Sequence, residues 1–491
     1  MKIKQLAFLI PVGLIVTGCG LLGPTYEKPQ LNSPNNWASK DRQTSAESMN
    51  LAQTAWWQKF NDTMLNQLIE SALSNNNNIQ IAMGNMLQAQ ASLRQVNMGW
   101  IPTVSIGGGG MVGQAFNPSF TNNTAQQLPN VAQGTQNISG YGYGVIPTYT
   151  LNVFEQIKRG EIAKLSLEMQ KQNINAVRLG VISQVASSYF TLLGLHRQLE
   201  LQQQLLADAL DLRKFTQIKL DKGSVSDLNL QGLDQYIASV RANIPMIKSD
   251  ITQAENALQV LTNNNPGKIK LSNNFDKITT NNIVPVNLPS AVLESRPDVA
   301  IAEYQLKVAN ADIGAARSMF FPTISLTGML GQGSMTLTNL FTAGGDLWMT
   351  QLAAFMPAFN MGIYAQIDKA KAGYYTAYYN YAQTVRSAFA QVDNSLASHD
   401  SLTENLKERQ QSLDKANNIY SIAQKQYKYG SIAYADTLNL KLNVDYALAS
   451  QNQVKIQQLN SLVNLYQALG GGYLVESSLS ATKKFNDGHD I

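Results

Sequence analysis

The sequence predicts an α+β membrane protein in which four β-strands per chain join long coiled-coil helices, all built from two repeats of one unit. Three observations carry this prediction. One hexamer occurs twice, two long stretches have the apolar period of helices, and the runs ahead of each stretch alternate like strands. A chain of 491 residues can hold two or three ordinary domains or one elongated one.

The repeat comes first, because it determines how every other segment is interpreted. Residues 100–105 read WIPTVS, and residues 320–325 read FFPTIS, 220 positions later. Flanking positions at the same offset also match in character. These pairs are Ile79 and Val299, Ile81 and Ile301, Ala82 and Ala302, Ala89 and Ala309, and Ala91 and Ala311. Duplication of a long unit explains this series better than chance.

The N-terminus has the pattern of a bacterial lipoprotein signal. Lys2 and Lys4 precede the apolar residues 6–16, a stretch that is too short to span a bilayer. The letters VTGC then end at Cys19, so we expect a signal peptide over residues 1–18 and covalent lipid on this cysteine. The alternative is a stray cysteine after a conventional signal peptide. Cys19 is the only cysteine of the sequence, which excludes a disulfide within the chain.

Two pairs of runs alternate with the two-residue period of β-strands. The first pair lies within about residues 103–153 as TVSIGGGGMVGQAF and NISGYGYGVIPTYTLNV. The second pair lies within about residues 323–359 as TISLTGMLGQ and DLWMTQLAAFMPAF. Each run could cross a bilayer as a tilted strand of about ten residues. We therefore expect four membrane-crossing strands per chain.

Four strands cannot close a barrel by themselves. The smallest membrane barrels have about eight strands, and an open sheet edge is not tolerated in lipid. The chain must therefore assemble with copies of itself. Two copies would supply eight strands and three copies twelve, so closure alone leaves the number of copies open.

A long helix is expected after each strand pair. No proline occurs between Pro147 and Pro245 or after Pro357. From residue 363 to residue 396, apolar or small residues recur at steps of three and four, which is typical of one helical face. A helix of about 66 residues would be about 100 Å long, which suits a coiled coil. The first half repeats this pattern from about residue 155 to residue 221.

Each long helix is expected to stop at a glycine and return. The sequences LDKGSVSDLNL and YKYGSIAYADTLNL place Gly223 and Gly430 at these turns, where glycine accepts the positive φ that ends a helix. The return helices are expected to end near Leu261 and Leu469. Pro245 is expected to kink the first of them.

The charge of the chain argues against several kinds of partner. Charged residues make up 14% of the sequence, and the formal net charge is +4, to which Lys2 and Lys4 of the signal contribute. No basic cluster remains that could follow a nucleic-acid backbone or an anionic membrane surface. We expect no nucleic-acid partner.

The sequence contains no convincing catalytic motif. Residues 108–113 satisfy G-x-G-x-x-G, but they lie in a strand-like run without the helix that dinucleotide binding requires. His196 and His399 stand alone on expected helices and His489 lies in a polar tail, so surface or groove histidines are favoured over metal ligands. We expect no enzymatic activity, no metal site and no cofactor beyond the lipid on Cys19.

Several long motifs resemble one family. They are GPTYEKP shortly after Cys19, WWQKFNDTMLNQLIESALSNNNNI at 56–79, LPSAVLESRPDVAIAEYQLKVANADIGAARSMFFPTISLTG at 288–328, and LVNLYQALGGGY at 462–473. They resemble the TolC family of outer-membrane efflux ducts, specifically its OprM- and NodT-like lipoprotein branch, over nearly the whole chain after Cys19. The resemblance implies a homotrimer with a twelve-stranded β-barrel and a long periplasmic α-barrel.

The resemblance also implies partners, location and domains. Such ducts lie in the outer membrane and receive substrate from an inner-membrane pump, here expected to be of the RND type, through a periplasmic adaptor protein. The expected parts are a lipidated tail over residues 19–55, a first repeat over 56–287, a second repeat over 288–470 and a polar tail over 471–491.

The resemblance places the functional residues at the periplasmic tip. The family constricts its duct there with acidic residues shortly after the second tip glycine, and the matching positions are Asp436 and Asn439. The lipoprotein branch usually has an aspartate at the position of Asn439. Because this chain has an uncharged asparagine there, the acidic ring is expected at Asp436 instead. The competing interpretation is a solvated acid near a helix start. The expected adaptor-docking loops are Gly223 with Ser224 and Gly430 with Ser431.

These observations favour a passive exit duct for small toxic molecules in a tripartite efflux system. The exit duct of a type I protein-secretion system has the same architecture and is the nearest alternative. A lipid-anchored periplasmic coiled-coil spacer without a pore belongs to another class, but it would not need paired strands. A cell-wall enzyme would need catalytic residues.

Overall fold

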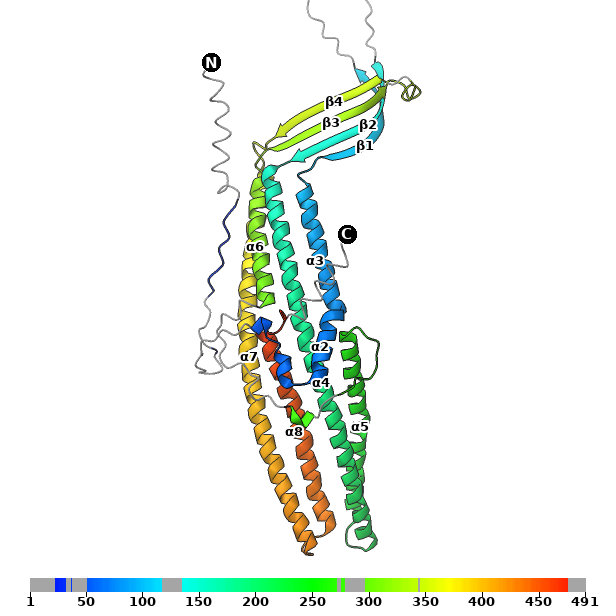
Figure 1. Ribbon diagram of the computed structural model, residues 1–491, viewed down its shortest axis with the longest axis vertical. Helices are drawn as coiled ribbons and strands as arrows, with labels where there is room; N and C mark the ends of the chain where they lie inside the picture. The colour runs from blue at the N-terminus through cyan, green and yellow to red at the C-terminus, as the bar shows by residue number, and fades with distance from the viewer. Residues whose placement is uncertain are drawn as a thin grey trace, which may run out of the picture. The chain divides into compact units, whose positions relative to one another are not determined.

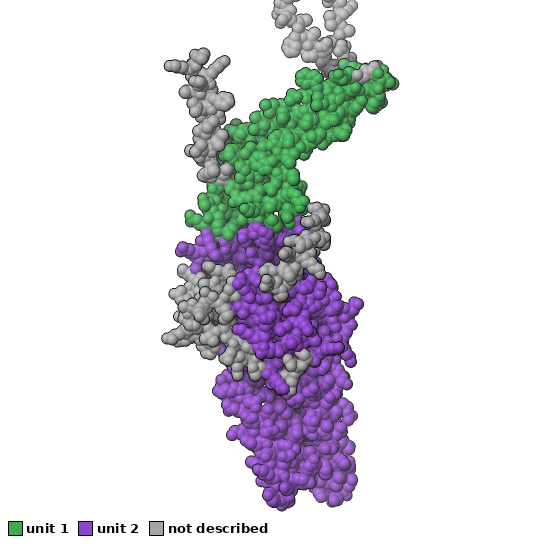
Figure 2. All heavy atoms as spheres, viewed as in Figure 1, with its two compact units in different colours: residues 1–27, 89–167, 306–377 green, residues 28–88, 168–305, 378–491 purple. Residues whose placement is uncertain are grey.

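The structure, a computed structural model, describes most of the chain. The described residues are 23–31, 37, 51–116, 135–271, 275–278, 296–342 and 345–475, with only the backbone described for 114–116 and 135–138. They belong to two compact units (Figure 2). We call residues 1–27, 89–167 and 306–377 the strand unit, and residues 28–88, 168–305 and 378–491 the helix unit.

The two halves of the chain repeat one order of elements (Figure 1). The first half contains α3 (Asn77–Met98), β1 (Thr103–Phe116), β2 (Thr135–Leu151), α4 (Val153–Asp221) and α5 (Asp227–Leu261). The second half contains α6 (Pro297–Ser318), β3 (Thr323–Ser334), β4 (Gly345–Phe355), α7 (Met361–Lys428) and α8 (Tyr434–Ala468). Both α6 and β3 begin 220 residues after their counterparts, the offset of the repeated hexamer. The predicted duplication is confirmed.

The long helices and their ends agree with the sequence pattern. α4 has 69 residues and α7 has 68, while the return helices α5 and α8 have 35 each. On α7 the predicted stripe is buried, as Val385, Ala388 and Val392 illustrate. α5 continues through Pro245 as a single helix. Its end at Leu261 and the end of α8 at Ala468 lie within one residue of expectation.

The middle of α4 departs from the expected one-sided stripe. Ile182, Ser183, Val185 and Ala186 are all buried, so this part of the helix is covered on most sides. α4 also contains an 18-residue window with a mean hydropathy of 1.2, of which 61% is buried inside the protein. Such a composition suits a core helix as well as a membrane span. The burial shows that most of this window lies inside the protein.

The strand unit contains one four-stranded antiparallel sheet in the order β1-β2-β3-β4. The two predicted strand pairs are confirmed, although several of their ends move by one to four residues. β2 ends at Leu151 because Asn152 starts α4, where its Oδ1 accepts a hydrogen bond from Glu155 N at 3.2 Å. β4 ends at Phe355 instead of continuing to residue 359, since Pro357 lacks the N–H that a strand ladder needs.

The helix ends next to the sheet are fixed to one another within the strand unit. The side-chain amide of Asn152 donates a hydrogen bond to Ser318 O at 3.1 Å, which joins the start of α4 to the end of α6. The rings of Phe154 and Phe321 lie 4.1 Å apart between centroids. Ala316 also packs with Ile363 and other apolar residues of α7. The sheet is therefore attached to three packed helix ends.

In the helix unit, the sequence motif that begins at Trp56 packs against the motif that contains Tyr466 and Gly472. Trp56 and Trp57 lie in the short 3-10 helix η3 (Trp56–Phe60) and are 1% exposed. Trp56 stacks on Tyr466 of α8, with 4.7 Å between ring centroids. Gly472 has a φ of 94°, and a Cβ there would lie 2.6 Å from Trp57. Only glycine fits this position, so the glycine run lets the chain pass over the two tryptophans.

Two further motif residues hold helix ends in the helix unit. Asp62 caps α2 (Thr63–Asn75) by accepting hydrogen bonds from the first backbone amides of that helix, and its other oxygen accepts one from Tyr189 Oη at 2.7 Å. Arg296 is buried at the start of α6, where it donates to both carboxylate oxygens of Asp298 and to Gln391 of α7. It also donates to the carbonyl of Ala468 at the end of α8. These residues fix packing rather than chemistry.

Candidate functional site

The predicted lipid attachment site, Cys19, lies outside the described residues. The segment that follows Cys19 lies against α6. In the strand unit, Asn310 Nδ2 donates to Pro24 O at 2.9 Å, and the ammonium of Lys307 lies 5.3 Å from the centre of the Tyr26 ring. In the helix unit, Lys28 forms an ion pair with Glu303 at 3.3 Å. The segment therefore runs antiparallel to α6.

One face of the sheet is apolar and exposed. The register places Ile106, Val145, Leu330 and Trp348 opposite one another in a row across all four strands. Their exposed fractions are 86%, 40%, 63% and 75%. Leaving such a row in water is unfavourable, because large exposed apolar patches mark contacts with lipid or protein. This face is the one suited to the membrane.

The opposite face carries rows of small or polar residues beside apolar ones such as Met111 and Met349. One row across the sheet is Thr103, Thr148, Thr327 and Gln351, and another is Gly109, Gly142, Gly333 and Gly345. Together with neighbouring residues, the glycines line a hollow of about 900 Å³. A Cβ added to Gly109 would meet no other atom within 4 Å. The glycine row itself carries no side chains, while Met111, Ile146, Met329 and Leu347 also line the hollow.

One glycine pair has a different role. Gly144 of β2 and Gly331 of β3 lie directly opposite each other in the antiparallel pairing of these two strands. A Cβ on Gly331 would overlap the carbonyl oxygen of Tyr143, and a Cβ on Gly144 would overlap that of Leu330. The backbones can approach this closely only because both residues lack a side chain.

Both predicted tip glycines end their helices as expected. Gly223 has a φ of 65° and Gly430 a φ of 74°. After α4, Ser224 N bonds to Lys219 O at 2.8 Å while Gly223 N bonds to Leu220 O at 2.8 Å. Ser431 and Gly430 make the same pair of bonds to Gln426 and Tyr427 after α7. These are two Schellman motifs, and they turn the chain into α5 and α8.

The predicted gate residues lie just after the second tip. Asp436 is in the first turn of α8, and Asn439 follows one turn later on the same exposed face. Asp436 Oδ2 accepts a hydrogen bond from Ala433 N at 3.3 Å, which stabilises the helix start. The two interpretations of Asp436 are therefore compatible, because one carboxylate can cap the helix and still face outward.

The structure reveals an ionic cluster that the sequence interpretation missed. Lys441 Nζ lies 3.2 Å from Asp208 Oδ2 of α4 and also contacts Asp445 Oδ1 on its own helix. The side chain of Asp445 is only 2% exposed. The spacing of four between Lys441 and Asp445 was a visible signal on α8, whereas the partner on α4 is 233 positions away from Lys441. No local pattern could have named Asp208.

One histidine interpretation is wrong. His399 is not a surface or groove residue, since it is 4% exposed and its Nδ1 lies 3.0 Å from Ser461 Oγ. Packing of α7 against α8 buries it in the seam between the two helices. His196 is half-buried, and His489 lies outside the described residues. Within the described ranges, no group of three metal-binding side chains is found.

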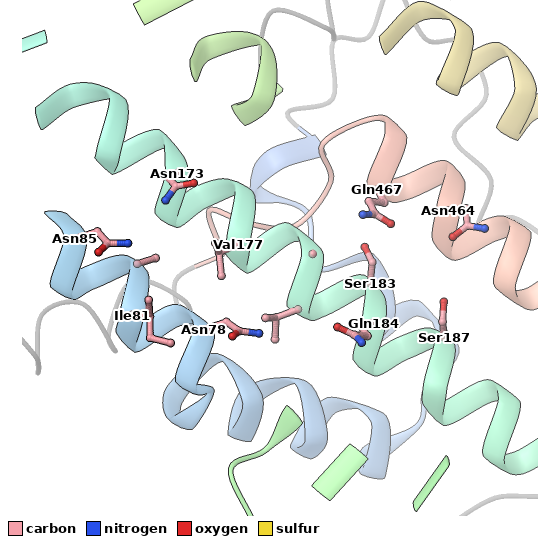
Figure 3. Close-up of a pocket in the computed structure, with 13 residues that line it drawn as sticks. Asn78, Ile81, Asn85, Asn173, Val177, Ser183, Gln184, Ser187, Asn464 and Gln467 are labelled. Atoms are coloured by element: carbon pink, nitrogen blue, oxygen red, sulfur yellow. The ribbon is translucent and has the colours of Figure 1, made fainter. Parts of the chain in front are cut away.

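A pocket of about 680 Å³ lies among α3, α4 and α8 in the helix unit (Figure 3). Its labelled polar residues are Asn78, Asn85, Asn173, Ser183, Gln184, Ser187, Asn464 and Gln467. Amides and hydroxyls can form hydrogen bonds, but they supply no general base for catalysis. The pocket is suited to polar contact rather than to a reaction.

The sequence profile of the family described as "Outer membrane efflux protein" matches residues 68–264 and 288–471, which is more than half of the chain. The chain is 29% identical over 483 residues to the "Probable outer membrane lipoprotein SilC" of Salmonella typhimurium, covering 96% of this chain and 99% of that protein. It is 28% identical over 465 residues to the "Cation efflux system protein CusC" of Escherichia coli O6:H1, covering 94% and 97%.

A solved structure has the same fold. The Campylobacter jejuni CmeC outer membrane channel superposes with a TM-score of 0.77 at 25% identity, covering 95% of this chain and 98% of that one. The likeness therefore spans the helices and the sheet together.

Proposed function

The chain belongs to the outer membrane efflux protein family, and from this premise we propose that three copies form a passive exit duct fed by an inner-membrane pump through a periplasmic adaptor protein. The observation that carries the proposal is the sheet. It has four strands, an apolar face and two edges, β1 and β4, that pair with no strand of the described chain. Lipid tolerates such edges only when they are paired with those of other copies. Three copies give twelve strands.

The two faces of the sheet support the assignment of outside and inside. The row that includes Ile106 and Trp348 faces lipid, and the glycine row that includes Gly109 faces the lumen. At the level of this row, the absence of side chains keeps the lumen wide. This suits a passive conduit, in which substrate selection is the task of the pump.

The same premise favours a substrate class. The description of the family names efflux, and that of CusC names cation efflux. We therefore favour the export of small molecules or ions over type I protein secretion. The pump is assigned to the RND type, as the resemblance of the lipoprotein branch implies.

We also assign the lipid anchor to Cys19. Pro24 contacts Asn310, eight residues before the end of α6 at Ser318, and β3 begins at Thr323. The four peptide steps from Cys19 to Gly23 reach at most about 14 Å. A lipid on Cys19 would thus be attached close to the part of the chain that carries the membrane strands.

The test is a planar-bilayer recording of purified protein, which should show open channels. Gly109→Leu should lower the single-channel conductance, because the new side chain has room and projects into the lumen. Val104→Leu is the matched control, since Val104 lies on the apolar face and is 66% exposed. The proposal fails if the wild-type protein forms no channel. Equal effects of the two substitutions would overturn the assignment of the faces.

A further inference from the structure

Asp208, Lys441 and Asp445 form a buried ionic cluster in the helix unit, between α4 and α8. Lys441 Nζ lies 3.2 Å from Asp208 Oδ2 and also contacts Asp445 Oδ1. The side chains of Asp208 and Lys441 are 16% and 21% exposed, and that of Asp445 is 2% exposed. The cluster connects the hairpin of α4 and α5 to the hairpin of α7 and α8 (Figure 1).

One buried acceptor of the cluster has no hydrogen-bond partner. Asp445 Oδ2 is buried and receives no hydrogen bond. A carboxylate can only accept, and the carboxyl group of Asp208 next to it can only accept as well unless one of the two is protonated. Two carboxylates beside one ammonium also leave one negative charge uncompensated. Burying such a charge without a partner is costly, so the site favours one more positive charge.

The other groups around the pair do not supply that charge. From α4, Gln204 Nε2 donates to Asp208 at 3.0 Å. From α5, Tyr236 faces the pair, and burial raises the pKa of its hydroxyl, so that it stays neutral. From α8, Tyr446 lies beside Tyr236 with 6.1 Å between ring centroids.

The fourth helix contributes no buried charge either. The hydrogen bond between Gln410 of α7 and Gln451 of α8 shows which residues of the two helices lie at the same height. At the level of Asp445, α7 buries Leu413, while its charged residues Asp414 and Lys415 are exposed. Beneath the pair, α4, α5 and α8 pack through an apolar cluster of Leu205, Ala209, Leu212, Ile237, Val240, Ala435, Leu438 and Leu442. None of the described groups around the pair supplies the missing positive charge, so a proton from solution is the natural source.

We propose that Asp208 and Asp445 form a proton-binding site that couples the two helical hairpins. One proton shared between the carboxyl groups, together with Lys441, holds α8 against α4. Loss of the proton leaves two carboxylates facing each other and weakens the link between the hairpins.

The electrostatics of the cluster support this site. Burial raises the pKa of Asp445 to about 6, and the neighbouring carboxyl group of Asp208 acts in the same direction, against the effect of Lys441. Burial acts to raise the pKa of Asp208, but the hydrogen bond from Gln204, the neighbouring carboxyl group of Asp445 and the charge of Lys441 hold it below its usual value. The proton therefore belongs to the pair and resides mainly on Asp445.

The sign of the pH effect follows. Because the folded pKa of Asp445 lies above the unfolded value, the folded state holds a proton that the unfolded state releases. This contribution to stability is fully present below about pH 4 and is lost as the pH rises through about 6. Coupling of the hairpins is therefore expected to be stronger in acid.

The test measures the thermal midpoint of the full-length protein in detergent from pH 4.5 to pH 7.5, compared with Asp445→Asn. The amide keeps the shape, donates a hydrogen bond to Asp208 and carries no charge. The variant should unfold at a higher temperature than the wild type at pH 7.5, and the difference should vanish towards pH 4.5. An ordinary ion pair predicts the reverse. A variant that is less stable than the wild type at pH 7.5 would overturn the proposal.

Three further variants test whether the pH at which the thermal midpoint changes shifts in the expected direction. Asp208→Asn should move the pH step to lower values, since one carboxylate is gone. Lys441→Met should move it to higher values, since the compensating charge is gone. Asp234→Asn is the matched control, because Asp234 pairs with Arg213 within one hairpin, with 2.9 Å between Oδ2 and Nη2. A pH step that keeps its position in Asp208→Asn and Lys441→Met, or that shifts in Asp234→Asn, would contradict the proton-binding site.

The consequence for transport rests on the proposed function. If the hairpins separate when the tip opens, Asp445→Asn channels should open less often at pH 7.5 than wild-type channels, and equally often at pH 5. Absence of any channel would contradict the duct, while the thermal measurements would still test the proton site independently. Normal channels together with a thermal difference that does not vary with pH would reject the site alone.

Discussion

At the scale of single residues, the positions that make the sequence recognisable differ from those expected to act in transport. Trp56, Gly472 and Arg296 belong to the motifs that define the resemblance, and each fixes buried packing in the helix unit. Asp436 and Asn439 are exposed and lie at the start of a helix. Packing residues have many neighbours to satisfy, whereas a pore-facing residue has few, and this explains why the gate could be named only through the family.

The gate prediction can be separated from the cap. Asp436→Ala removes both the charge and the hydrogen bond to Ala433 N, whereas Asp436→Asn removes the charge and retains an acceptor for that bond. If three Asp436 carboxylates surround the pore axis, both variants should weaken cation selectivity and block by multivalent cations in planar-bilayer recordings. Asn439→Asp should strengthen both properties.

The contrary outcome is equally specific. A solvated acid at a helix start predicts unchanged selectivity in both variants, with a loss of stability of about 0.5–1 kcal/mol for Asp436→Ala and a smaller loss for Asp436→Asn, which keeps the acceptor. Thermal unfolding of the same preparations separates the two interpretations. Unchanged selectivity in both charge-removing variants would remove Asp436 from the gate.

At the scale of elements, the sheet shows how glycine serves two needs at once. The row that contains Gly109 leaves open space above the sheet, whereas Gly144 and Gly331 allow two backbones to approach closely. Sequence alternation alone treats these glycines alike. Only the strand register separates glycines that line a surface from glycines that fit a contact.

This distinction predicts opposite results for one small change. Gly331→Ala should impair assembly into a heat-resistant oligomer, because its Cβ would overlap the carbonyl oxygen of Tyr143. Gly109→Ala adds the same methyl group to the same face, where nothing lies within 4 Å, and should assemble normally. Semi-native gel electrophoresis of membranes checks both. Equal assembly of the two variants would show that the crossing of β2 and β3 tolerates a side chain.

At the scale of the whole molecule, assembly supplies what one chain lacks. A single chain exposes a large apolar face and two unpaired strand edges in its described sheet. The proposed trimer buries the edges in one closed barrel, and the lipid covers the apolar face. The proposed lipid on Cys19 would add an anchor that is independent of the barrel.

Native mass spectrometry in detergent should therefore detect a trimer that carries acyl groups at an N-terminal Cys19. Cys19→Ser should abolish acylation and leave the trimer intact, because closure depends on strand edges and not on the anchor. Detection of a stable dimer or monomer as the main species would remove the twelve-strand barrel. An unmodified wild-type cysteine would remove the lipid anchor while leaving the barrel open to test.

The sequence alone determined the features that depend on local periodicity and on duplication. The repeated hexamer set the offset of α3 and α6, steps of three and four marked the long helices, and Gly223 and Gly430 marked their ends. Each of these signals is contained in neighbouring residues, or in one stretch compared with its copy. Local backbone preferences and the direction of one apolar face are enough to produce them.

The tertiary structure decided which distant residues meet. The pairing of Asp208 with Lys441, the burial of His399 against Ser461 and the close crossing at Gly331 all join segments that are far apart in the chain. The apolar period of a helix shows that a residue faces another element. It does not show which element that is, or which of its residues lies opposite. That choice is made when whole helices and strands pack, because a shift of one residue in register exchanges every contact along the interface.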